Sequence, residues 1–530
     1  MGFVLNSIRR FDKWRLCLVV FAVAYGCVLA LDLGSKSMMW DEVTHFTGGL
    51  LLSRGQVGLW VWTNSFYPPV YDIVAAFYYL LIGPSVFAGR LVAVTFSVLS
   101  ILVVYEIANR LYNAKTALIA AIFFGVMPGV VFLSRLAMIE TLLLFIFSLS
   151  MLFFFSWIRT GRERDRIISI AALAVGVAVK YQMLVVVPII MLLGMYFWKR
   201  EYLKTELKSY LRFPRIVALI AAAVVVGVVA YALLSSGLLN TLLYAIREGT
   251  AEKAVYSVRY PTPIFYLIEM TWADNIMHPV SLLLYVAGLA GIGLLVCRRK
   301  REDKFLLLWF TVVYVIFTLI PNREWRYITI AFPVLAIAAA SLLTTAFDRL
   351  HKIGQTAKNS LTRKWGAKLA AVILIAFTAT GVYYSCADAY NWVNANQFQV
   401  PVEQASYYAA QNLNQNQTLV VACPVNRFTM FMVWFYLNIE NPSQNYSQTW
   451  QYPQLAADAY TPNFNTTDFI SLCRERNVKY VLLYEYGWLQ YFNSTMTEKD
   501  VYNMLNETGR FTLQNSFGTW PNRIFVFSFN

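Results

Sequence analysis

Residues 39–55, which read MWDEVTHFTGGLLLSRG, follow one apolar segment, Leu16–Leu33, and precede roughly ten more apolar runs of span length. They place two adjacent carboxylates, Asp41 and Glu42, at a membrane surface. Ionisable groups at such a position are costly and are usually functional. His45 follows Asp41 by four residues, so on a helix the two side chains share a face. We therefore expect this stretch to carry the reactive groups of a membrane protein.

The composition is that of a protein with many membrane spans. The chain has 530 residues, of which 58% are hydrophobic, and its mean hydropathy is +0.52. Soluble globular domains are about 45–50% apolar. The basic start, MGFVLNSIRRFDKWR, leads into an apolar run that no small-residue cleavage site follows. We therefore expect a retained first span rather than a cleaved signal peptide.

Apolar runs of about 20 residues predict eleven membrane spans. An odd number of spans places the two ends of the chain on opposite sides of the membrane. The predicted spans lie near residues 16–34, 91–109, 116–133, 141–157, 167–180, 183–198, 215–235, 276–297, 305–320, 327–347 and 367–385.

The positive charge is concentrated on one side of these spans. The formal net charge is +15, and 27 of the 44 Lys and Arg residues lie in six segments that we assign to the inside. The outer loops of the membrane part carry ten. This bias predicts a cytoplasmic N-terminus and an extracytoplasmic C-terminus. The basic charge therefore indicates topology and attraction to anionic lipid, not nucleic-acid binding. The inner segments are 1–15, 110–115, 158–166, 199–215, 298–304 and 349–368.

The composition changes after Tyr384, where Asn, Gln and other polar residues replace the apolar runs. Helix-like stretches alternate there with strand-like ones, which predicts a small α/β domain. We therefore divide the chain into a membrane domain, residues 1–385, and an extracytoplasmic soluble domain, residues 386–530. The helix-like stretches are Val402–Leu413, Thr467–Arg476 and Glu498–Leu505, and the strand-like ones are Thr418–Ala422, Tyr480–Tyr484 and Arg523–Phe527.

Five Asn-X-Ser/Thr sequons lie in the soluble domain, and the first 400 residues contain none. Their clustering supports the outward placement of this domain. Cys423 and Cys473 are the two cysteines deep in the domain, and they either form a disulfide or stay free thiols. The sequence has no CxxC motif and no His/Cys metal-binding spacing. The predicted glycosylation sites are Asn416, Asn445, Asn465, Asn493 and Asn506.

Two stretches resemble a known enzyme family. Residues 66–152, which include FYPPVYDIV and VFLSRLAMIETLLLF, and residues 322–340, NREWRYITIAFPVLAIAAA, resemble the protein mannosyltransferase-related glycosyltransferases. These are GT-C fold enzymes that use polyprenyl-phosphate sugars. The resemblance implies an α-helical polytopic membrane protein of that fold, to which the C-terminal α/β domain is added. The matching marks are Asp41–Glu42, Pro68–Pro69, Gly83–Pro84, Arg90–Leu91, Ser134–Arg135 and Glu140.

The resemblance also implies a reaction, the inverting transfer of a sugar from polyprenyl (dolichyl) phosphate to an acceptor hydroxyl. Asp41 matches the family's catalytic Asp, and a carboxylate there can take the proton of the acceptor as it attacks. Attack opposite the phosphate inverts the anomeric centre in one step, so one base suffices. Glu42 is expected to orient the acceptor or a metal ion.

Cationic side chains on the outer side are expected to bind the departing phosphate, because its negative charge grows during transfer. Each of them has the alternative of reaching lipid headgroups. Glu140 and His45 are expected to support the acceptor, although Glu140 stands where many relatives have Asp. The candidate phosphate ligands are Arg135, Lys180, Arg323 and Arg326.

The sequence requires no cofactor, but it offers one divalent-cation site. In some relatives a histidine near the position of His278 approaches the carboxylate of the first loop. His278 with Asp41 or Glu42 would suit Zn²⁺ or Mn²⁺, with Mg²⁺ as a further candidate. The alternative for His278 is a capping or interfacial role at the start of a span.

Two other functions stay open, a transporter or flippase for lipid-linked sugars and a non-catalytic membrane scaffold. A transporter favours broken helices at mid-membrane and internal repeats, and no convincing repeat is visible. The acceptor is a protein, a glycan or a lipid. Residues 484–488, YEYGW, imperfectly resemble the acceptor-reading segment of oligosaccharyltransferases. Aromatic residues at the end of a strand more often belong to the core.

Overall fold

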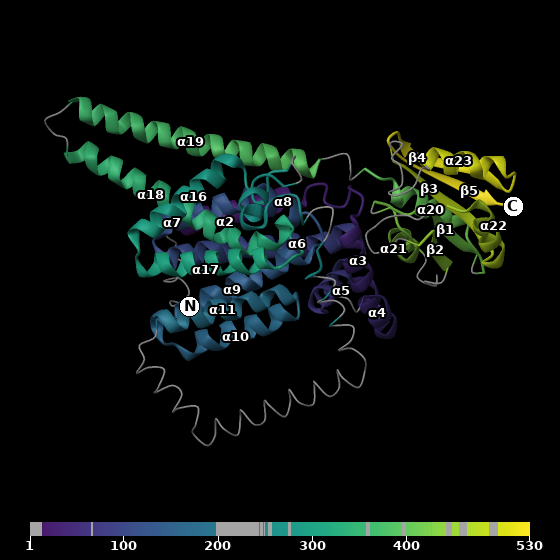
Figure 1. Ribbon diagram of the computed structural model, residues 1–530, viewed down its shortest axis with the longest axis horizontal. Coiled ribbons are helices and arrows are strands. Elements are labelled where there is room, and N and C mark those ends of the chain that lie inside the picture. Colours follow the sequence, from purple (N-terminus) through teal and green to yellow (C-terminus); the bar gives the residue numbers. More distant parts are fainter. Residues whose placement is uncertain are drawn as a thin grey trace, which may run out of the picture.

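The computed structural model shows a bundle of apolar helices with a small sheet domain beside one end (Figure 1). The predicted span 215–235 and the sequon residues Asn445 and Asn493 lie outside the residues that the structure describes. The described residues are 13–64, 67–197, 243, 247, 250–252, 257–273, 277–356, 361–394, 399–414, 416–425, 427–440, 448–454, 464–486 and 497–530.

The bundle is built around two helices, α9 (Ile139–Thr160) and α18 (Phe332–Thr356). In α9, and in the segment Trp325–Gln355 that contains most of α18, 78% of the most apolar window is buried. The corresponding values are 17% in α2 and 11% in residues Trp365–Val393 of α19. Helices α2 and α19 therefore expose apolar side chains at the edge of the bundle, as lipid-facing helices do. The further bundle helices are α2 (Lys13–Ala30), α6 (Val86–Leu111), α7 (Ala114–Gly125), α8 (Pro128–Ser134), α10 (Glu163–Val177), α11 (Val186–Phe197), α16 (Leu282–Arg298), α17 (Arg301–Leu319) and α19 (Leu361–Val393).

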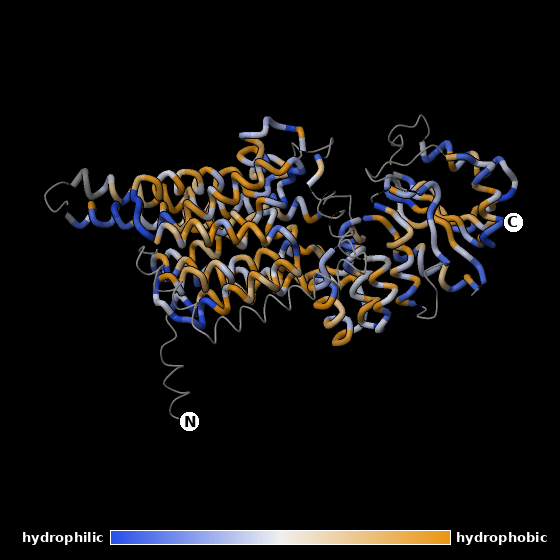
Figure 2. Tube along the Cα trace, turned by 60° about the horizontal axis from the view of Figure 1, so that its bottom comes forward, coloured by the Kyte–Doolittle hydropathy of each residue, from blue (hydrophilic) through white to orange (hydrophobic). Residues whose placement is uncertain are grey.

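Five described helices are long and apolar enough to cross a membrane, or six if the pair α7–α8, which bends by 65°, forms one span. The bundle is strongly hydrophobic along its length, and the far end of the α18–α19 hairpin is hydrophilic (Figure 2). The chain is a membrane protein, as predicted. The number of eleven spans is not confirmed, because α11 and α16 have 12 and 17 residues and an upright span needs about 20.

Small residues let α16 and α18 approach closely. A side-chain carbon on Gly291 would lie 2.3 Å from the carbonyl oxygen of Ala338. Small residues at such contacts are typical of helix packing in membranes. The contact fixes the position of α18. This helix follows directly in the chain on the short helix η3 (Trp325–Ala331), which carries Arg326.

The segment between α2 and α6 is helical, and its helices are α3 (Trp40–Ser53), α4 (Val57–Asn64) and α5 (Val70–Ile82). They lie at the end of the bundle nearest the sheet domain (Figure 1). Helix α3 packs on α6 so closely that a side-chain carbon on Gly89 would lie 2.3 Å from the Phe46 ring. This packing fixes the helix that begins with Trp40, Asp41 and Glu42.

The soluble domain contains a five-stranded sheet in the order β2-β1-β3-β5-β4. Strands β1, β2 and β3 are parallel, whereas β5 is antiparallel to both β3 and β4. Alternate residues of β1 face opposite layers: Leu419 packs in the core with α20 and α21, and Val420 packs with α22 and α23. The elements are α20 (Val402–Asn412), β1 (Thr418–Ala422), α21 (Met430–Glu440), β2 (Thr449–Tyr452), α22 (Thr466–Glu475), β3 (Val478–Tyr486), α23 (Glu498–Glu507), β4 (Phe511–Thr519) and β5 (Asn522–Phe529).

The six helix-like and strand-like stretches predicted in this domain correspond to α20, α22, α23, β1, β3 and β5. Tyr484 is buried in the core of β3, as aromatic residues in strands usually are. Cys423 and Cys473 are both buried, free thiols. The predicted division at residue 385 falls inside α19, which continues to Val393. Asn416, Asn465 and Asn506 are exposed.

Helix α21 of the soluble domain docks on α3. The Arg54 guanidinium at the end of α3 donates from Nη2 to the Asn438 carbonyl at 2.8 Å, and the rings of Phe46 and Phe435 lie 5.3 Å apart. The Val400 amide also donates to the Ser37 hydroxyl just before α3, at 3.3 Å. The soluble domain therefore contacts both ends of the helix that carries Asp41.

The stability of the soluble domain should depend on the charge of Glu498. Burial, and then the nearby charge of Glu485, raises the pKa of the Glu498 carboxyl to about 7. The folded domain thus holds a proton that the unfolded chain releases near pH 4.5, so stability falls as pH rises between these values. We expect the thermal midpoint of the domain to fall from pH 5 to pH 8.

Glu498→Gln should flatten this dependence, because the amide cannot ionise. Glu507→Gln on the same helix is the matched control, since Glu507 is exposed, and it should keep the wild-type slope. A wild-type slope in Glu498→Gln would contradict the assignment. Scanning calorimetry of the full-length protein at several pH values measures both variants.

Candidate active site

Five charged side chains from four segments of the membrane domain meet at the start of α3. Arg326 of η3 donates from Nη1 to Asp41 Oδ2 at 2.6 Å and pairs through its other nitrogens with Glu324. Lys180, just before the short helix η1 (Tyr181–Val185), donates to Glu140 Oε1 at 2.8 Å. Glu140 and Arg326 also attract each other electrostatically. We name these five residues the Asp41 centre.

Asp41 is the most accessible carboxylate of this centre. Its side chain is 31% exposed, whereas those of Glu324 and Glu140 are 19% and 4% exposed. Its Oδ1 atom makes no hydrogen bond with the described residues, while Oδ2 is held by Arg326. Asp41 thus has one oxygen fixed in direction and one open to a ligand.

Glu42, the next residue, points the other way and is fully buried. Its Oε1 accepts from Arg90 Nε at 2.8 Å and from the Ala137 amide at 2.7 Å. Its Oε2 accepts from Arg90 Nη2 at 2.8 Å and from the Met39 amide at 2.9 Å. Both oxygens are therefore saturated by the protein, which corrects the expectation that Glu42 orients an acceptor or a metal ion.

Arg90 is the other half of this anchor. It is 1% exposed, and it also donates to the carbonyls of Leu33, Lys36 and Ser37 at 2.8–3.0 Å. Its guanidinium thus ties the turn before α3 to α6. The Glu42–Arg90 pair fixes the backbone of α3, and with it the direction of Asp41.

Tyr67, just before α5, lies beside the Asp41 centre and feels its charges. Burial, and then the negative charge of Asp41, raises the pKa of the Tyr67 phenol well above its usual value. Arg326, Glu140 and Glu324 act on the same phenol electrostatically. The phenol is therefore neutral.

A small cavity lies behind Glu140. Glu140 Oε2 is buried and has no hydrogen-bond partner among the described residues. The cavity wall carries the hydroxyls of Ser97, Ser100, Ser134, Thr141 and Thr329. Among the described residues, Glu140 is therefore held by Lys180 through Oε1 alone.

His45 belongs to a separate buried network. Its Nδ1 lies 2.9 Å from Asp72 Oδ1, and Trp60 donates to the other Asp72 oxygen at 2.8 Å. The His45 ring also lies 4.6 Å from the Tyr71 ring and 5.3 Å from the Tyr67 ring. His45 therefore packs beside Tyr67. Its side-chain hydrogen bond goes to Asp72 and not to a residue of the Asp41 centre.

Two of the predicted phosphate ligands lie outside the Asp41 centre. Arg135 donates from Nη1 to the Leu29 carbonyl of α2 at 2.8 Å. Arg323 is buried and donates to the carbonyls of Thr318 and Ser257. Of the four predicted cations, the structure thus brings Lys180 and Arg326 together with Asp41.

The predicted metal site does not form among the described residues. His278 Nδ1 lies 2.6 Å from the Thr271 carbonyl, and its ring meets Trp272 edge to face at 4.9 Å. Within the described part of the chain, no three His, Cys, Asp or Glu side chains group as metal ligands. Because Glu42 is saturated as well, the residues present do not fit a divalent cation held by His278 and this pair.

Sequence reasoning missed Arg90, Tyr67 and Glu324 as parts of the site. Arg90 and Tyr67 lie in stretches that carry the family resemblance, and Glu324 lies within NREWRY beside Arg326. A buried carboxylate needs a buried cation, so Arg90 could have been proposed as the partner of one of the two adjacent carboxylates. Nothing in the sequence indicated which of the two adjacent carboxylates turns inward.

Comparisons with known proteins agree with this architecture. A family model described as dolichyl-phosphate-mannose-protein mannosyltransferase matches residues 67–245. The structure of ArnT from Cupriavidus metallidurans in the apo state is similar with a TM-score of 0.60 and 15% identity, over 96% of this chain and 97% of that one. The chain has the GT-C fold. The predicted family resemblance and fold class are thereby confirmed.

Two further GT-C structures are similar. ArnT from Cupriavidus metallidurans bound to undecaprenyl phosphate gives a TM-score of 0.57 at 15% identity, over 96% of this chain and 97% of that one. The oligosaccharyltransferase AglB from Archaeoglobus fulgidus, in complex with an inhibitory peptide and a dolichol-phosphate, gives 0.52 at 12% identity, over 88% and 69%. No significant match was found among curated protein sequences.

Glu42→Gln should destabilise this GT-C protein strongly. The change leaves the Arg90 guanidinium buried without its counter-charge, and breaking a buried pair in this way costs about 3–5 kcal/mol. We expect the thermal midpoint of the purified protein to fall by many degrees in a fluorimetric unfolding scan.

Glu106→Gln on α6 is the matched control. Glu106 and Arg110 form an i,i+4 pair in which both side chains are 32% exposed, and such surface pairs contribute less than about 1 kcal/mol. Equal midpoints for the two variants would show that the Glu42–Arg90 pair does not anchor α3.

Proposed function

We propose that this protein transfers a sugar from a polyprenyl phosphate donor to an acceptor hydroxyl, with Asp41 as the general base. The observation that carries the proposal is the geometry of Asp41, which has one oxygen on Arg326 and the other open at a partly exposed position. A general base must reach the acceptor proton directly or through one water. Asp41 meets that condition, and the saturated Glu42 does not.

The proposed reaction is a single displacement that inverts the anomeric centre. The acceptor oxygen attacks the anomeric carbon and its proton passes to Asp41 as the bond from that carbon to the phosphate oxygen breaks. The polyprenyl phosphate leaves as a monoester with one more negative charge. Because attack and departure occur on opposite faces of the sugar, the site needs one base and a cation for the phosphate.

Arg326 is the proposed cation for the phosphate. Its guanidinium already joins Asp41 and Glu324, so a phosphate that reaches it competes with the Asp41 carboxylate. Donor binding would then release Asp41 from Arg326 and free its second oxygen. The base would become fully available only when the donor is in place, which limits proton transfer to the loaded enzyme.

Lys180 is proposed to support this exchange through Glu140. Its ammonium is bound to Glu140 and lies 5.2 Å from the centre of the Tyr327 ring. The Asp41 centre has three carboxylates and two cations. An incoming phosphate therefore binds a cation only if at least one of the existing ion pairs opens. The carboxylate it displaces is proposed to be Asp41, the most exposed of the three.

The titles of the similar structures support the proposed donor class. ArnT binds undecaprenyl phosphate and AglB binds dolichol-phosphate, both of them polyprenyl phosphates. The family model that matches residues 67–245 describes a dolichyl-phosphate-mannose-protein mannosyltransferase. We propose the same donor class here, with a protein, glycan or lipid as the acceptor.

We further propose that Asp41 and the soluble domain lie on the extracytoplasmic side and the α18–α19 hairpin end on the cytoplasmic side. The basic residues of segment 349–368 favour that orientation. In intact cells, an impermeant thiol reagent should label Arg474→Cys and not Lys352→Cys, in a background from which the four exposed native cysteines are removed. Labelling of Lys352→Cys and not of Arg474→Cys would show that the orientation is opposite to the proposed one.

Asp41→Asn should abolish transfer without weakening donor binding. The amide is nearly isosteric and cannot take the acceptor proton, and a general base contributes about 10²–10⁴-fold to the rate. Polyprenyl phosphate should bind at least as tightly as to wild type, because Arg326 loses a competing carboxylate. Release of polyprenyl phosphate from a panel of polyprenyl-phosphate sugars, and equilibrium binding of polyprenyl phosphate, measure the two effects.

Two variants complete this test. Glu163→Gln, at an exposed carboxylate of α10, is the matched control and should keep both rate and binding. Arg326→Ala should lose donor binding by roughly tenfold or more, the size of a charge-assisted hydrogen bond. Wild-type turnover by Asp41→Asn would show that Asp41 is not the base. Unchanged donor binding by Arg326→Ala would show that Arg326 is not the phosphate ligand.

A further inference from the structure

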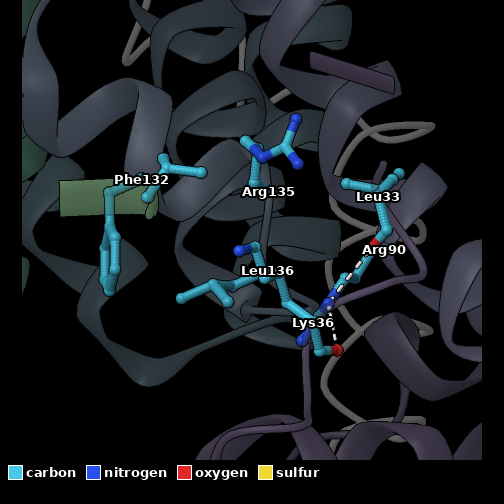
Figure 3. A pocket seen from close by; sticks show the side chains of 7 residues that line it. Leu33, Lys36, Arg90, Phe132, Arg135 and Leu136 are labelled. Atoms are coloured by element: carbon cyan, nitrogen blue, oxygen red, sulfur yellow. Dashed lines mark hydrogen bonds between the residues drawn. The ribbon is translucent and has the colours of Figure 1, made fainter. Parts of the chain in front are cut away.

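A second basic site lies on the other side of the Glu42–Arg90 pair. It is a small open hollow, and the charged residues that line it are Lys36, Arg90 and Arg135. Figure 3 shows Phe132 at one side of this hollow and Leu33, Arg90 and Lys36 at the other, with Arg135 and Leu136 between them. We name this site the Lys36 hollow.

Two cations that line the Lys36 hollow have N–H groups that make no hydrogen bond within the described residues. The Lys36 ammonium makes no hydrogen bond or ion pair with the described residues. Arg135 uses Nη1 on the carbonyls at the end of α2, and its Nε and Nη2 have no partner in the described part of the chain. Arg90 is neutralised by Glu42. The carboxylate that acts electrostatically on Arg135 is the exposed Asp32.

The rest of the hollow is apolar. Leu33, Phe132, Leu136 and Val393 line it beside the cations. Phe132 stacks at 4.3 Å on Trp392 near the end of α19. A purely hydrated anion would gain nothing from such walls, whereas an amphiphile with an anionic head would bury apolar surface against them.

The hollow lies where three apolar helices end. Residues after the last turns of α2 and α8, and Val393 at the end of α19, line it, and all three helices belong to candidate membrane spans. Val28 and Leu31 near the end of α2 are 62% and 64% exposed, and Tyr390 on α19 is 70% exposed. A lipid-facing surface therefore leads to the mouth of the hollow.

We propose that the Lys36 hollow binds the phosphate group of a membrane lipid. The Lys36 ammonium and the free edge of the Arg135 guanidinium supply the donors that a phosphate accepts, and the lipid chains lie along α2 and α19. The site is separate from the Asp41 centre, because Glu42 and Arg90 lie between Asp41 and the hollow. It does not depend on the proposed reaction, and it gives the protein a fixed lipid beside α3.

Binding to the purified full-length protein in detergent tests this proposal with three probes. Dioleoyl phosphatidic acid carries the phosphate and the chains, dioleoylglycerol carries the chains alone, and inorganic phosphate carries the anion alone. We expect phosphatidic acid to bind at least about tenfold more tightly than dioleoylglycerol, the contribution of one charge-assisted hydrogen bond. Inorganic phosphate should not displace it at equal concentration.

Lys36→Gln should remove about tenfold of this affinity, and Lys36→Gln combined with Arg135→Gln should remove the preference for phosphatidic acid. Lys36→Arg combined with Arg135→Lys should retain it, because the charges remain. Arg247→Gln is the matched control at an exposed arginine outside the hollow, and it should bind as wild type does.

Three outcomes would overturn the proposal in whole or in part. Equal wild-type binding of phosphatidic acid and dioleoylglycerol would show that no phosphate is recognised. Unchanged binding by Lys36→Gln, which removes no contact within the described protein, would show that the phosphate binds elsewhere. Displacement by inorganic phosphate at equal concentration would show that the hollow binds a free anion, and the proposed lipid would be wrong.

Discussion

The buried ion pair between Glu42 and Arg90 is the interaction on which the arrangement of the bundle end nearest the sheet domain depends. Arg90 donates to three backbone carbonyls before α3 and to both oxygens of Glu42, so it joins the end of the first span to α6. A buried charge of this kind is tolerated only when it is paired and hydrogen-bonded. The pair therefore fixes one register of α3. That register turns Asp41 toward Arg326 and leaves the Lys36 hollow on the opposite side.

Adjacent carboxylates thus have opposite tasks. Glu42 is saturated and structural, whereas Asp41 shares a single hydrogen bond with Arg326 and stays open to a ligand. The soluble domain adds to the same constraint, because α21 and Val400 contact both ends of α3. The docked domain therefore holds the helix that carries Asp41 at both of its ends.

The general class of the fold followed from the sequence, since apolar runs and a composition change after Tyr384 are strong signals. Six elements of the soluble domain were also predicted, but α21 was not, because its sequence MFMVWFYLNIE is apolar on every face and has no helical period. Asp41, Arg326, Lys180 and Glu140 were predicted and do meet. The inward turn of Glu42, and the separation of Arg135 and Arg323 from the site, depend on contacts between distant segments, which spacing along the chain does not encode.

In the proposed reaction a donor phosphate takes Arg326 from Asp41 and so frees the base. The most direct measurement is an experimental structure of the wild-type protein with polyprenyl phosphate bound. We expect a phosphate oxygen within hydrogen-bond distance of Arg326, an opened Asp41–Arg326 contact, and an unchanged Glu42–Arg90 pair. A bound phosphate remote from Arg326, with the Asp41–Arg326 contact intact, would contradict it.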